Sequence, residues 1–151
     1  MSRHDLAREV IIDAPAEVVF AAVTDWPAQG RWVLGTRVAA DGPAEGVGGR
    51  FTAFTGLGPV GFGDPMEITE WDPPRLVAIR HTGRVVRGSG SFHVHPLPDG
   101  RSRMVWREQL DVPLGAVGRA AFVLARPVLA AMLGRSLSAL AHLVESGQLG
   151  S

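Results

Sequence analysis

Alternating hydrophobic and polar positions run through most of the chain up to residue 111 and predict an antiparallel sheet. The β-branched segment AREVIID is typical of a strand near the N-terminus. From residue 33 onward, Gly, Pro and Asp interrupt the alternating runs every eight to twelve residues, which is the spacing of hairpin turns. The pattern predicts one N-terminal strand and a six-stranded meander, at 6–13, 33–40, 49–55, 62–71, 75–82, 87–96 and 102–111.

Two stretches depart from this alternation and have the pattern of helices. DAPAEVVFAAVTD predicts a helix with its cap at residue 13 or 14 and with Pro15 at the first helical position, where no N–H is needed. The following WPAQGRWV is long enough for only one further helical turn. From Pro113 to about Ser146 the Ala- and Leu-rich sequence predicts a long helix, and Pro127 in its middle predicts a kink or a break.

The apolar run AAFVLARPVLAAMLG within this last helix raises the question of a membrane span. Arg126 and Pro127 interrupt the run, and its length is well under the roughly 18 residues that a span requires. The sequence therefore predicts no transmembrane segment. The beginning, MSRHDLAREVIID, carries charges where a signal peptide would need an apolar core, which favours a cytoplasmic protein.

Length and charge narrow the range of functions. The 151 residues fit a single domain, 1–151, that is large enough to bury a substantial core. Fifteen Arg balance fifteen acidic residues without forming a cluster, so no net field attracts nucleic acid. Lys and Cys are absent, which excludes a Schiff-base lysine, a P-loop lysine, a cysteine nucleophile, a disulfide and a thiolate metal site.

Four segments, in this order, resemble one known family. They are IIDAPAEVVFAAVTDWPAQGRW, GPAEGVGGRF, PMEITEWDPPRLVAIRH and GSFHVHPLPDGRSRMVWREQL. The chain is similar to the SRPBCC (START-like) superfamily, in particular to its polyketide cyclase/dehydrase-like branch. The resemblance covers nearly the whole chain and implies an α+β helix-grip fold. In this fold a curved seven-stranded antiparallel sheet wraps around a long C-terminal helix, with two short helices between strands 1 and 2.

The resemblance also implies a deep cavity for an apolar or aromatic ligand, and we expect no cofactor. Proteins on this scaffold include lipid carriers, hormone receptors, polyketide cyclases and chaperone-like proteins, so the fold alone names no activity. The string GLGPVG, from Gly56 to Gly61, matches the dinucleotide-binding pattern G-x-G-x-x-G. It contains Pro59 and precedes a strand instead of a helix, so we interpret it as a connection at the cavity mouth.

The predicted strand faces decide the role of two closely spaced histidines, His93 and His95. An H-x-H pair on a strand shares one face and can ligate a metal ion. In SFHVH, however, Phe92 and Val94 are apolar and take the buried face, which leaves both histidines on the outer face. We therefore expect no metal site. In the alternative, a flipped strand, His93 would line the cavity.

Alternation places His81 and Glu108 on the inner face of the sheet. In RLVAIRH, His81 shares a face with Val77 and Ile79, and in RMVWREQL, Glu108 shares a face with Trp106. An ionisable group in an apolar wall is costly unless paired, so a contact between the two would reduce that cost. The pair would be a polar anchor for a ligand, an acid/base couple, or a structural link between the sheet and the C-terminal helix.

The remaining candidate ligand-binding residues are large apolar side chains that serve equally well as plain core: Trp32, Phe51, Phe54, Ile79, Phe92, Trp106, Phe122 and Met132. A pocket with apolar walls and few polar groups is typical of a small-molecule site. Our leading hypothesis is therefore a protein that binds a hydrophobic or aromatic small molecule, lipid or polyketide-like, beneath its C-terminal helix.

Two alternatives remain open. The first is an enzyme of the polyketide aromatase/cyclase type, in which the cavity folds a reactive chain and His81 or Glu108 moves protons. The second is a homodimer or partner-docking module that uses the segment 113–126 as an exposed apolar surface. Substituting His81 and Glu108 separates the enzyme from the binding protein, and light scattering tests the docking module.

Overall fold

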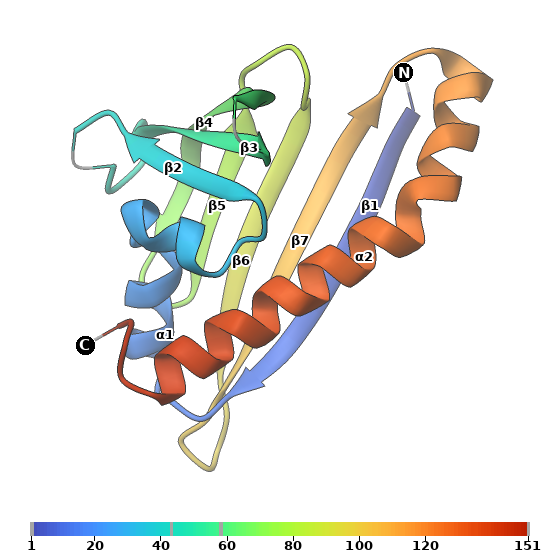
Figure 1. Cartoon of the computed structure of the whole chain (residues 1–151). Helices are drawn as coiled ribbons and strands as arrows, with labels where there is room; N and C mark the ends of the chain where they lie inside the picture. Colours follow the sequence, from blue (N-terminus) through green and yellow to red (C-terminus); the bar gives the residue numbers. More distant parts are fainter. Residues whose placement is uncertain (1, 43, 58, 151) are drawn as a thin grey trace.

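The computed structural model describes residues 2–42, 44–57 and 59–150 (Figure 1). β1 (Ser2–Ile12) leads into α1 (Ala16–Val23) and the 3-10 helix η1 (Trp26–Arg31), and α2 (Gly115–Glu145) follows the last strand. Between η1 and α2 lie six strands: β2 (Thr36–Ala40), β3 (Arg50–Leu57), β4 (Val60–Asp72), β5 (Leu76–His81), β6 (Gly88–Pro96) and β7 (Ser102–Val112).

The strands form one sheet with the order β1-β7-β6-β5-β4-β3-β2, and every neighbouring pair is antiparallel. Strands β2 to β7 are therefore neighbours in sequence order, as the turn spacing predicts. β1 pairs along its whole length with β7, from Ser2 opposite Val112 to Ile12 opposite Ser102. The predicted α+β helix-grip fold, with its curved seven-stranded sheet, long C-terminal helix and two short helices between strands 1 and 2, is confirmed (Figure 1).

Differences from the predicted boundaries have local causes. β1 begins at Ser2 instead of residue 6, because pairing with β7 extends it beyond the apolar run. β2 begins at Thr36 instead of residue 33, because the chain turns at Gly35 with a φ of 68°. Pro15 is the cap of α1, with an extended ψ of 158°, so the helix starts one residue later than predicted.

α2 runs without interruption from Gly115 to Glu145 and contains Pro127. Figure 1 shows that the helix changes direction in its first half, so Pro127 accompanies a kink and not a break. The helix packs mainly against β1. Its two halves have different surroundings, because Leu137 and Leu140 in the second half are buried whereas Leu124 in the first half is exposed.

By length and composition alone, α2 is the one helix in the described part of the chain that could cross a membrane. A window of 18 residues with no more than two charged residues passes this test, which the core helix of a water-soluble protein passes as well. Arg126 interrupts the apolar run without ending it. Only 11% of that window is buried, whereas Leu137 and Leu140 in the second half of the helix are buried in the core.

The core lies between the sheet and the segments α1, η1 and the second half of α2. Trp26 of η1 stacks on Phe51 of β3 with ring centroids 4.0 Å apart, and its Nε1 donates to the Ala44 carbonyl oxygen at 2.7 Å. Val94 and Met104, on β6 and β7, are fully buried. The Trp26 contacts fix η1 over the sheet, and this arrangement forms one wall of a cavity.

The glycine-rich string at 56–61 connects β3 to β4, and Gly58 lies outside the described residues. Gly56 pairs with Gly61 across the ladder, and a Cβ on Gly56 would lie 2.1 Å from the Val60 carbonyl oxygen. The close approach of the two backbones therefore accounts for these two glycines. Because β4 follows, this connection does not open the helix that a dinucleotide site needs.

Candidate functional site

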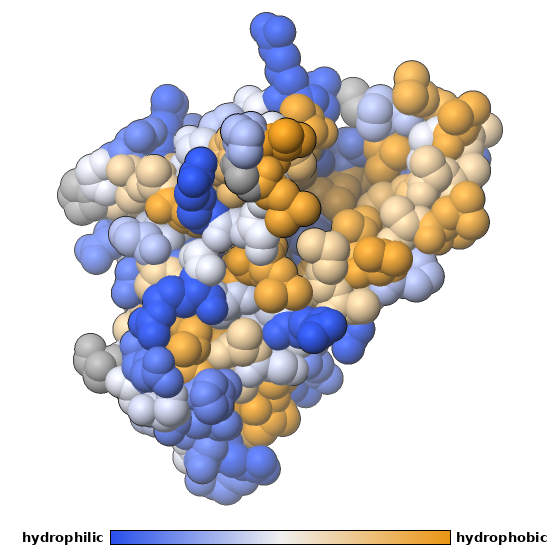
Figure 2. Space-filling view, in the orientation of Figure 1, coloured by the Kyte–Doolittle hydropathy of each residue, from blue (hydrophilic) through white to orange (hydrophobic). Residues whose placement is uncertain are grey.

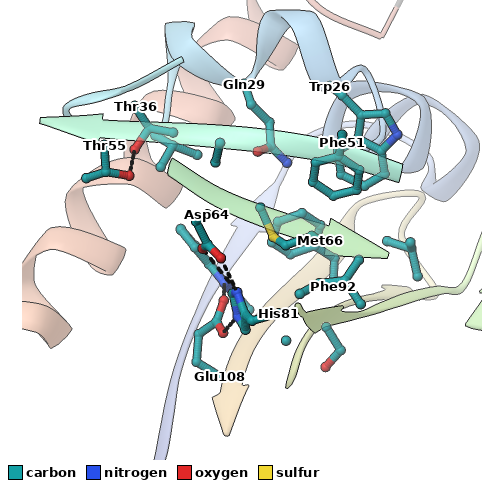
Figure 3. A pocket seen from close by; sticks show the side chains of 17 residues that line it. Trp26, Gln29, Thr36, Phe51, Thr55, Asp64, Met66, His81, Phe92 and Glu108 are labelled. Atoms are coloured by element: carbon teal, nitrogen blue, oxygen red, sulfur yellow. Dashed lines mark hydrogen bonds and ion pairs between the residues drawn. The ribbon is translucent and has the colours of Figure 1, made fainter. Parts of the chain in front are cut away.

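A partly enclosed cavity of about 150 Å³ lies between the sheet and η1. Figure 3 shows its lining, which comes mainly from η1 and the strands β2 to β7. The walls are mostly apolar, and the polar side chains that face the cavity are Gln29, Thr36, Thr55, Asp64, His81 and Glu108. No described residue of α2 lines the cavity, so it does not lie beneath the C-terminal helix, where the sequence predicts the ligand. The reason is that α2 packs on β1, at the opposite edge of the sheet from β2.

The strands present the faces that the alternation predicts. Val77, Ile79 and His81 on β5 all line the cavity, and so do Trp106 and Glu108 on β7. Residues two apart on a strand share a face, so the apolar members of each strand carry the ionisable one inward with them. Both predicted ionisable residues therefore border the same space.

His81 lies between two carboxylates at one end of the cavity (Figure 3). Its Nδ1 is 2.9 Å from Asp64 Oδ1 and 3.0 Å from Asp64 Oδ2, and its Nε2 is 3.0 Å from Glu108 Oε2. The contact considered between His81 and Glu108 is therefore present. The side chains of His81, Asp64 and Glu108 are only 5%, 12% and 15% exposed, so water screens their charges poorly.

Asp64 is the member of this cluster that the sequence prediction missed. It lies on β4 and shares a face with the buried Met66 and Ile68. The alternation that selects His81 therefore also places Asp64 inward, and a buried carboxylate requires a partner. Met66 pairs with His81 in the β4–β5 ladder, so Asp64, two residues away, reaches the imidazole ring diagonally.

The two carboxylates change the protonation of His81. Burial lowers the pKa of the imidazole, because it removes water from the charged form. Hydrogen bonds to Asp64 and Glu108, together with their negative charges, outweigh burial and raise the pKa from 6.5 to about 9. At neutral pH His81 is therefore an imidazolium whose two N–H groups donate to carboxylates. In this state it accepts no proton, so the role of a general base would fall to a carboxylate.

Two further residues hold Glu108 in place. Trp106 Nε1 donates to Glu108 Oε1 at 2.8 Å. The strand β6 lies between the strands of His81 and Glu108, and its Gly90 pairs with Glu108. A Cβ on Gly90 would lie 2.8 Å from each carboxylate oxygen of Glu108. The missing side chain at position 90 therefore lets Glu108 reach across β6 to His81.

Among the described residues that line the cavity, only Asp64, His81 and Glu108 have ionisable side chains, and they form one cluster. Two carboxylates face one imidazolium, so the cluster has one negative charge in excess at neutral pH. Beside it, the rings of Phe92 and Trp106 stand edge to face with centroids 5.6 Å apart. The arrangement can hold a hydrogen-bond donor at the polar end and an apolar ring against the aromatic wall.

Three predicted lining residues lie elsewhere. Phe54 is on the outer face of β3, because residues 51 and 53 take the inner face, and the Arg37 guanidinium carbon lies 4.7 Å from its ring centroid. Phe122 is buried against a histidine ring of β1, with centroids 4.6 Å apart. Met132 is exposed on α2. Phe122 and Met132 miss the cavity because their helix packs on β1.

The other apolar candidates lie at the cavity or directly behind it. Phe51, Ile79, Phe92 and Trp106 line the cavity. Trp32 is buried behind this lining, with its ring centroid 5.8 Å from those of Phe92 and Trp106. Its Nε1 has no hydrogen-bond partner within the part of the chain that the structure describes. Trp32 thus supports the aromatic wall from behind.

His93 and His95 lie on the outer face of β6, as predicted, because the neighbouring Phe92 and Val94 are buried on the inner face. The two imidazole rings are stacked with centroids 6.0 Å apart. Burial, followed by the nearby charge of His95, lowers the pKa of His93. Across residues 2–42, 44–57 and 59–150, no group of three or more His, Asp or Glu side chains is arranged to hold a metal ion.

Comparison of the sequence with known protein families identifies one match. The family described as polyketide cyclase / dehydrase and lipid transport matches residues 3–145, which is nearly the whole chain. No curated protein matches the chain in sequence.

Several solved structures share the fold at low sequence identity. TTHA0849 from Thermus thermophilus superimposes with a TM-score of 0.79 at 16% identity, covering 95% of this chain and 99% of that chain. The Zhui aromatase/cyclase from Streptomyces sp. R1128 superimposes with a TM-score of 0.72 at 18% identity, covering 95% of this chain and 94% of that chain. The di-domain ARO/CYC BexL, from the BE-7585A biosynthetic pathway, gives 0.71 at 19% identity, covering 94% of this chain and 46% of that chain. At these identities the likeness shows the fold alone.

Proposed function

The chain belongs to the polyketide cyclase / dehydrase and lipid transport family, and on this basis we propose that it binds a hydrophobic or aromatic small molecule in the cavity. The observation that carries the proposal is an apolar cavity with a single ionisable cluster at one end. Ligand sites have this composition, because apolar walls provide affinity and a few polar groups fix orientation. An engineered cavity of about 150 Å³ in another protein binds one benzene molecule. Because the cavity here has about the same volume, the enclosed part of the ligand is about one ring.

The buried cluster supports a role in binding. Ionised side chains in an apolar wall cost free energy, and packed apolar residues of similar volume are often as stable, so a cluster that borders a cavity indicates function. Among the described residues, its hydrogen bonds join β4, β5 and β7, and none reaches α2. This favours a ligand anchor over a link between the sheet and the C-terminal helix.

Native mass spectrometry of the purified protein, followed by denaturing extraction, tests the proposal. We expect a small apolar molecule in near-stoichiometric amount, which an excess of an added aromatic compound such as indole displaces. A scavenged lipid would be recognised by its failure to compete with indole. Purified protein that carries no molecule and does not bind indole would contradict the proposal.

A matched pair of variants assigns the binding to the cavity. Ala53 on β3 lines the cavity, so Ala53→Phe fills it and should abolish binding of indole. Ala39 is exposed on the outer face of the adjacent β2, so Ala39→Phe adds the same side chain away from the cavity and should leave binding unchanged. Equal binding by both variants would mean that the ligand lies somewhere else.

A second candidate function is catalysis of the polyketide aromatase/cyclase type. The observation that favours it is the placement of the Asp64 and Glu108 carboxylates at the edge of the cavity, where a carboxylate could move a proton while the walls orient a reactive chain. With Glu108→Gln or His81→Gln, an enzyme should lose turnover of a linear poly-β-ketone while it still binds that compound. Loss of affinity alone would favour a binding protein.

The docking hypothesis concerns the segment 113–126 at the start of α2, and the structure leaves most of its large apolar side chains uncovered. Leu114, Val117, Val123 and Leu124 are between 57% and 81% exposed, whereas Phe122 is buried. Figure 2 shows hydrophobic side chains gathered over this part of the helix. A homodimer through this surface stays a prediction, and light scattering tests it, because a strict monomer at high concentration would contradict it.

A further inference from the structure

We propose that the ligand presents a hydrogen-bond donor, in its strongest form an ammonium group joined through a carbon atom to an aromatic ring, to the carboxylates of Asp64 and Glu108. This inference rests on the proposed function and names the chemical class of the ligand. Arylalkyl amines, which are protonated at neutral pH, should bind best, neutral alcohols or phenols less tightly, and aromatic acids worst. Three observations support the inference: the excess charge of the cluster, its free acceptor positions and the composition of the cavity walls.

The charge at the polar end of the cavity selects against anions. Asp64 and Glu108 carry two negative charges against the one positive charge of His81, and no Arg side chain among the described residues lines the cavity to offset the difference. These side chains are 5% to 15% exposed, so Coulomb interactions between them and a ligand are stronger than in water. A ligand carboxylate would raise the excess negative charge, whereas an ammonium group would cancel it.

Within the cluster, every N–H group already donates a hydrogen bond, whereas the carboxylates can still accept more. Both ring N–H groups of His81 and the indole N–H of Trp106 already donate to the carboxylates. An ionised carboxylate has about four acceptor positions, so Asp64 and Glu108 retain free ones. Because the cluster offers no free N–H, the ligand itself must supply the N–H or O–H group.

Gln29 provides a separate observation on η1. Its residue is only 6% exposed, it lines the cavity, and Figure 3 shows its amide directed towards the interior. The amide Nε2 is 3.5 Å from the Val23 carbonyl oxygen, at the limit of a hydrogen bond. A buried amide normally has stronger partners, so a second polar atom of the ligand would complete its hydrogen bonding.

The walls beside the cluster suit a cationic aromatic group. Phe92 and Trp106 line the cavity and stand edge to face, and Trp106 also binds Glu108. Aromatic faces attract cations through their π electrons, and they pack well against another ring. A ring that carries an ammonium group therefore satisfies both the aromatic wall and the carboxylates.

Four ligands that share one ring but differ in the attached group test the inference: benzylamine, benzyl alcohol, toluene and benzoate. Their dissociation constants with the wild-type protein would be measured at neutral pH by NMR titration. We expect benzylamine to bind about tenfold to a hundredfold more tightly than toluene, because it gains a charge-assisted hydrogen bond. Benzyl alcohol should lie between these two, and benzoate should bind most weakly.

Charge-neutralising variants show whether the cluster causes this ranking. Glu108→Gln removes the excess charge with little change in shape, so the preference for benzylamine over benzoate should fall by about tenfold or more while toluene binds as before. Asp64→Asn removes one charge from the other side of His81 and serves as a second variant if the first fails to fold. Glu70→Gln makes the same change on the outer face of the sheet and should leave the ranking unaltered.

The outcomes separate this inference from the proposed function. Benzoate binding as tightly as benzylamine would overturn the inference, and so would a ranking that both cluster variants leave unchanged. In either case, binding of toluene would still support the proposed function. If none of the four ligands binds, both proposals fail.

Discussion

The stability of this protein should fall as the pH rises towards 9, because folding increases the affinity of His81 for a proton. In the unfolded chain the imidazole has its ordinary pKa of 6.5, whereas the folded structure raises the pKa to about 9. Between these two values the native state holds one more proton than the unfolded state. The stabilisation is therefore complete below pH 6.5 and is lost as the pH rises through about 9.

The size of the effect follows from the difference between the two pKa values. One pKa unit corresponds to about 1.4 kcal/mol, so a rise from 6.5 to about 9 corresponds to about 3 kcal/mol. Within this window the free energy of unfolding should decrease by about 1.4 kcal/mol for each pH unit. Such a loss is a large part of the stability of a typical domain, which is about 5–15 kcal/mol.

Urea denaturation followed by tryptophan fluorescence measures this slope, and an NMR titration of the His81 ring gives the folded pKa directly. The composition of the chain suits the experiment, because it contains no Lys, Tyr or Cys, whose side chains titrate between about pH 8 and 10.5. The pKa of His93 is lowered, so this residue changes charge at a lower pH. The slope at alkaline pH therefore reports mainly on His81.

Variants of the cluster provide the controls. His81→Gln cannot take up the proton, so its free energy of unfolding should stay nearly constant over the same range. Glu108→Gln removes one of the two partners of the imidazole, which lowers the pKa of His81 and moves the loss of stability to lower pH. The reasoning is refuted if wild-type stability is constant between about pH 7 and 9, or if His81 in the folded protein titrates near 6.5.

Three further predictions concern packing, and a fourth concerns the cluster. Leu140→Ala should reduce the free energy of unfolding in urea by about 2–5 kcal/mol, because Leu140 is fully buried. The exposed Leu124→Ala should change it by less than about 0.5 kcal/mol, and a larger effect that grows with protein concentration would indicate that a second copy covers this surface. Gly118→Ala should lower the melting temperature, because a Cβ there would lie 1.8 Å from a carbonyl oxygen of the preceding loop. An unchanged melting temperature would mean that the loop moves aside. Gly90→Ala should displace the Glu108 carboxylate and lower the pKa of the neighbouring imidazole in an NMR titration, and an unaltered titration would contradict the role assigned to this glycine.

The local pattern of the sequence was sufficient to place individual side chains on faces of the sheet. His81 and Glu108 lie inward and His93 lies outward as predicted, because the apolar residues two positions away identify the buried face without any knowledge of strand pairing. The same pattern could have found Asp64, which alternates with two apolar residues on its strand. Phe54 does not line the cavity, because residues 51 and 54 are three apart on β3 and therefore take opposite faces of the sheet.

Strand pairing, which the local pattern does not specify, decided which inward groups meet. Asp64, His81 and Glu108 come from β4, β5 and β7, and their contacts require the observed register of four adjacent strands. They also require Gly90 on β6, where a side chain would block Glu108. These residues are far apart in the sequence, and a shift of one position in any ladder would turn a strand's inward side chains outward.

The position of α2 is a second feature that the sequence left open. A helix that is apolar on several sides can be buried, but its composition does not say against which part of the sheet it packs. Packing on β1 places Phe122 and Met132 away from the cavity and leaves most of the large apolar side chains in the first half of the helix exposed. The sequence by itself thus determined the strands, their faces and the inward placement of the ionisable residues, because alternation is a local property. Only the tertiary structure decided the cavity and its charged cluster, because both are assembled from separate strands whose register depends on the whole fold.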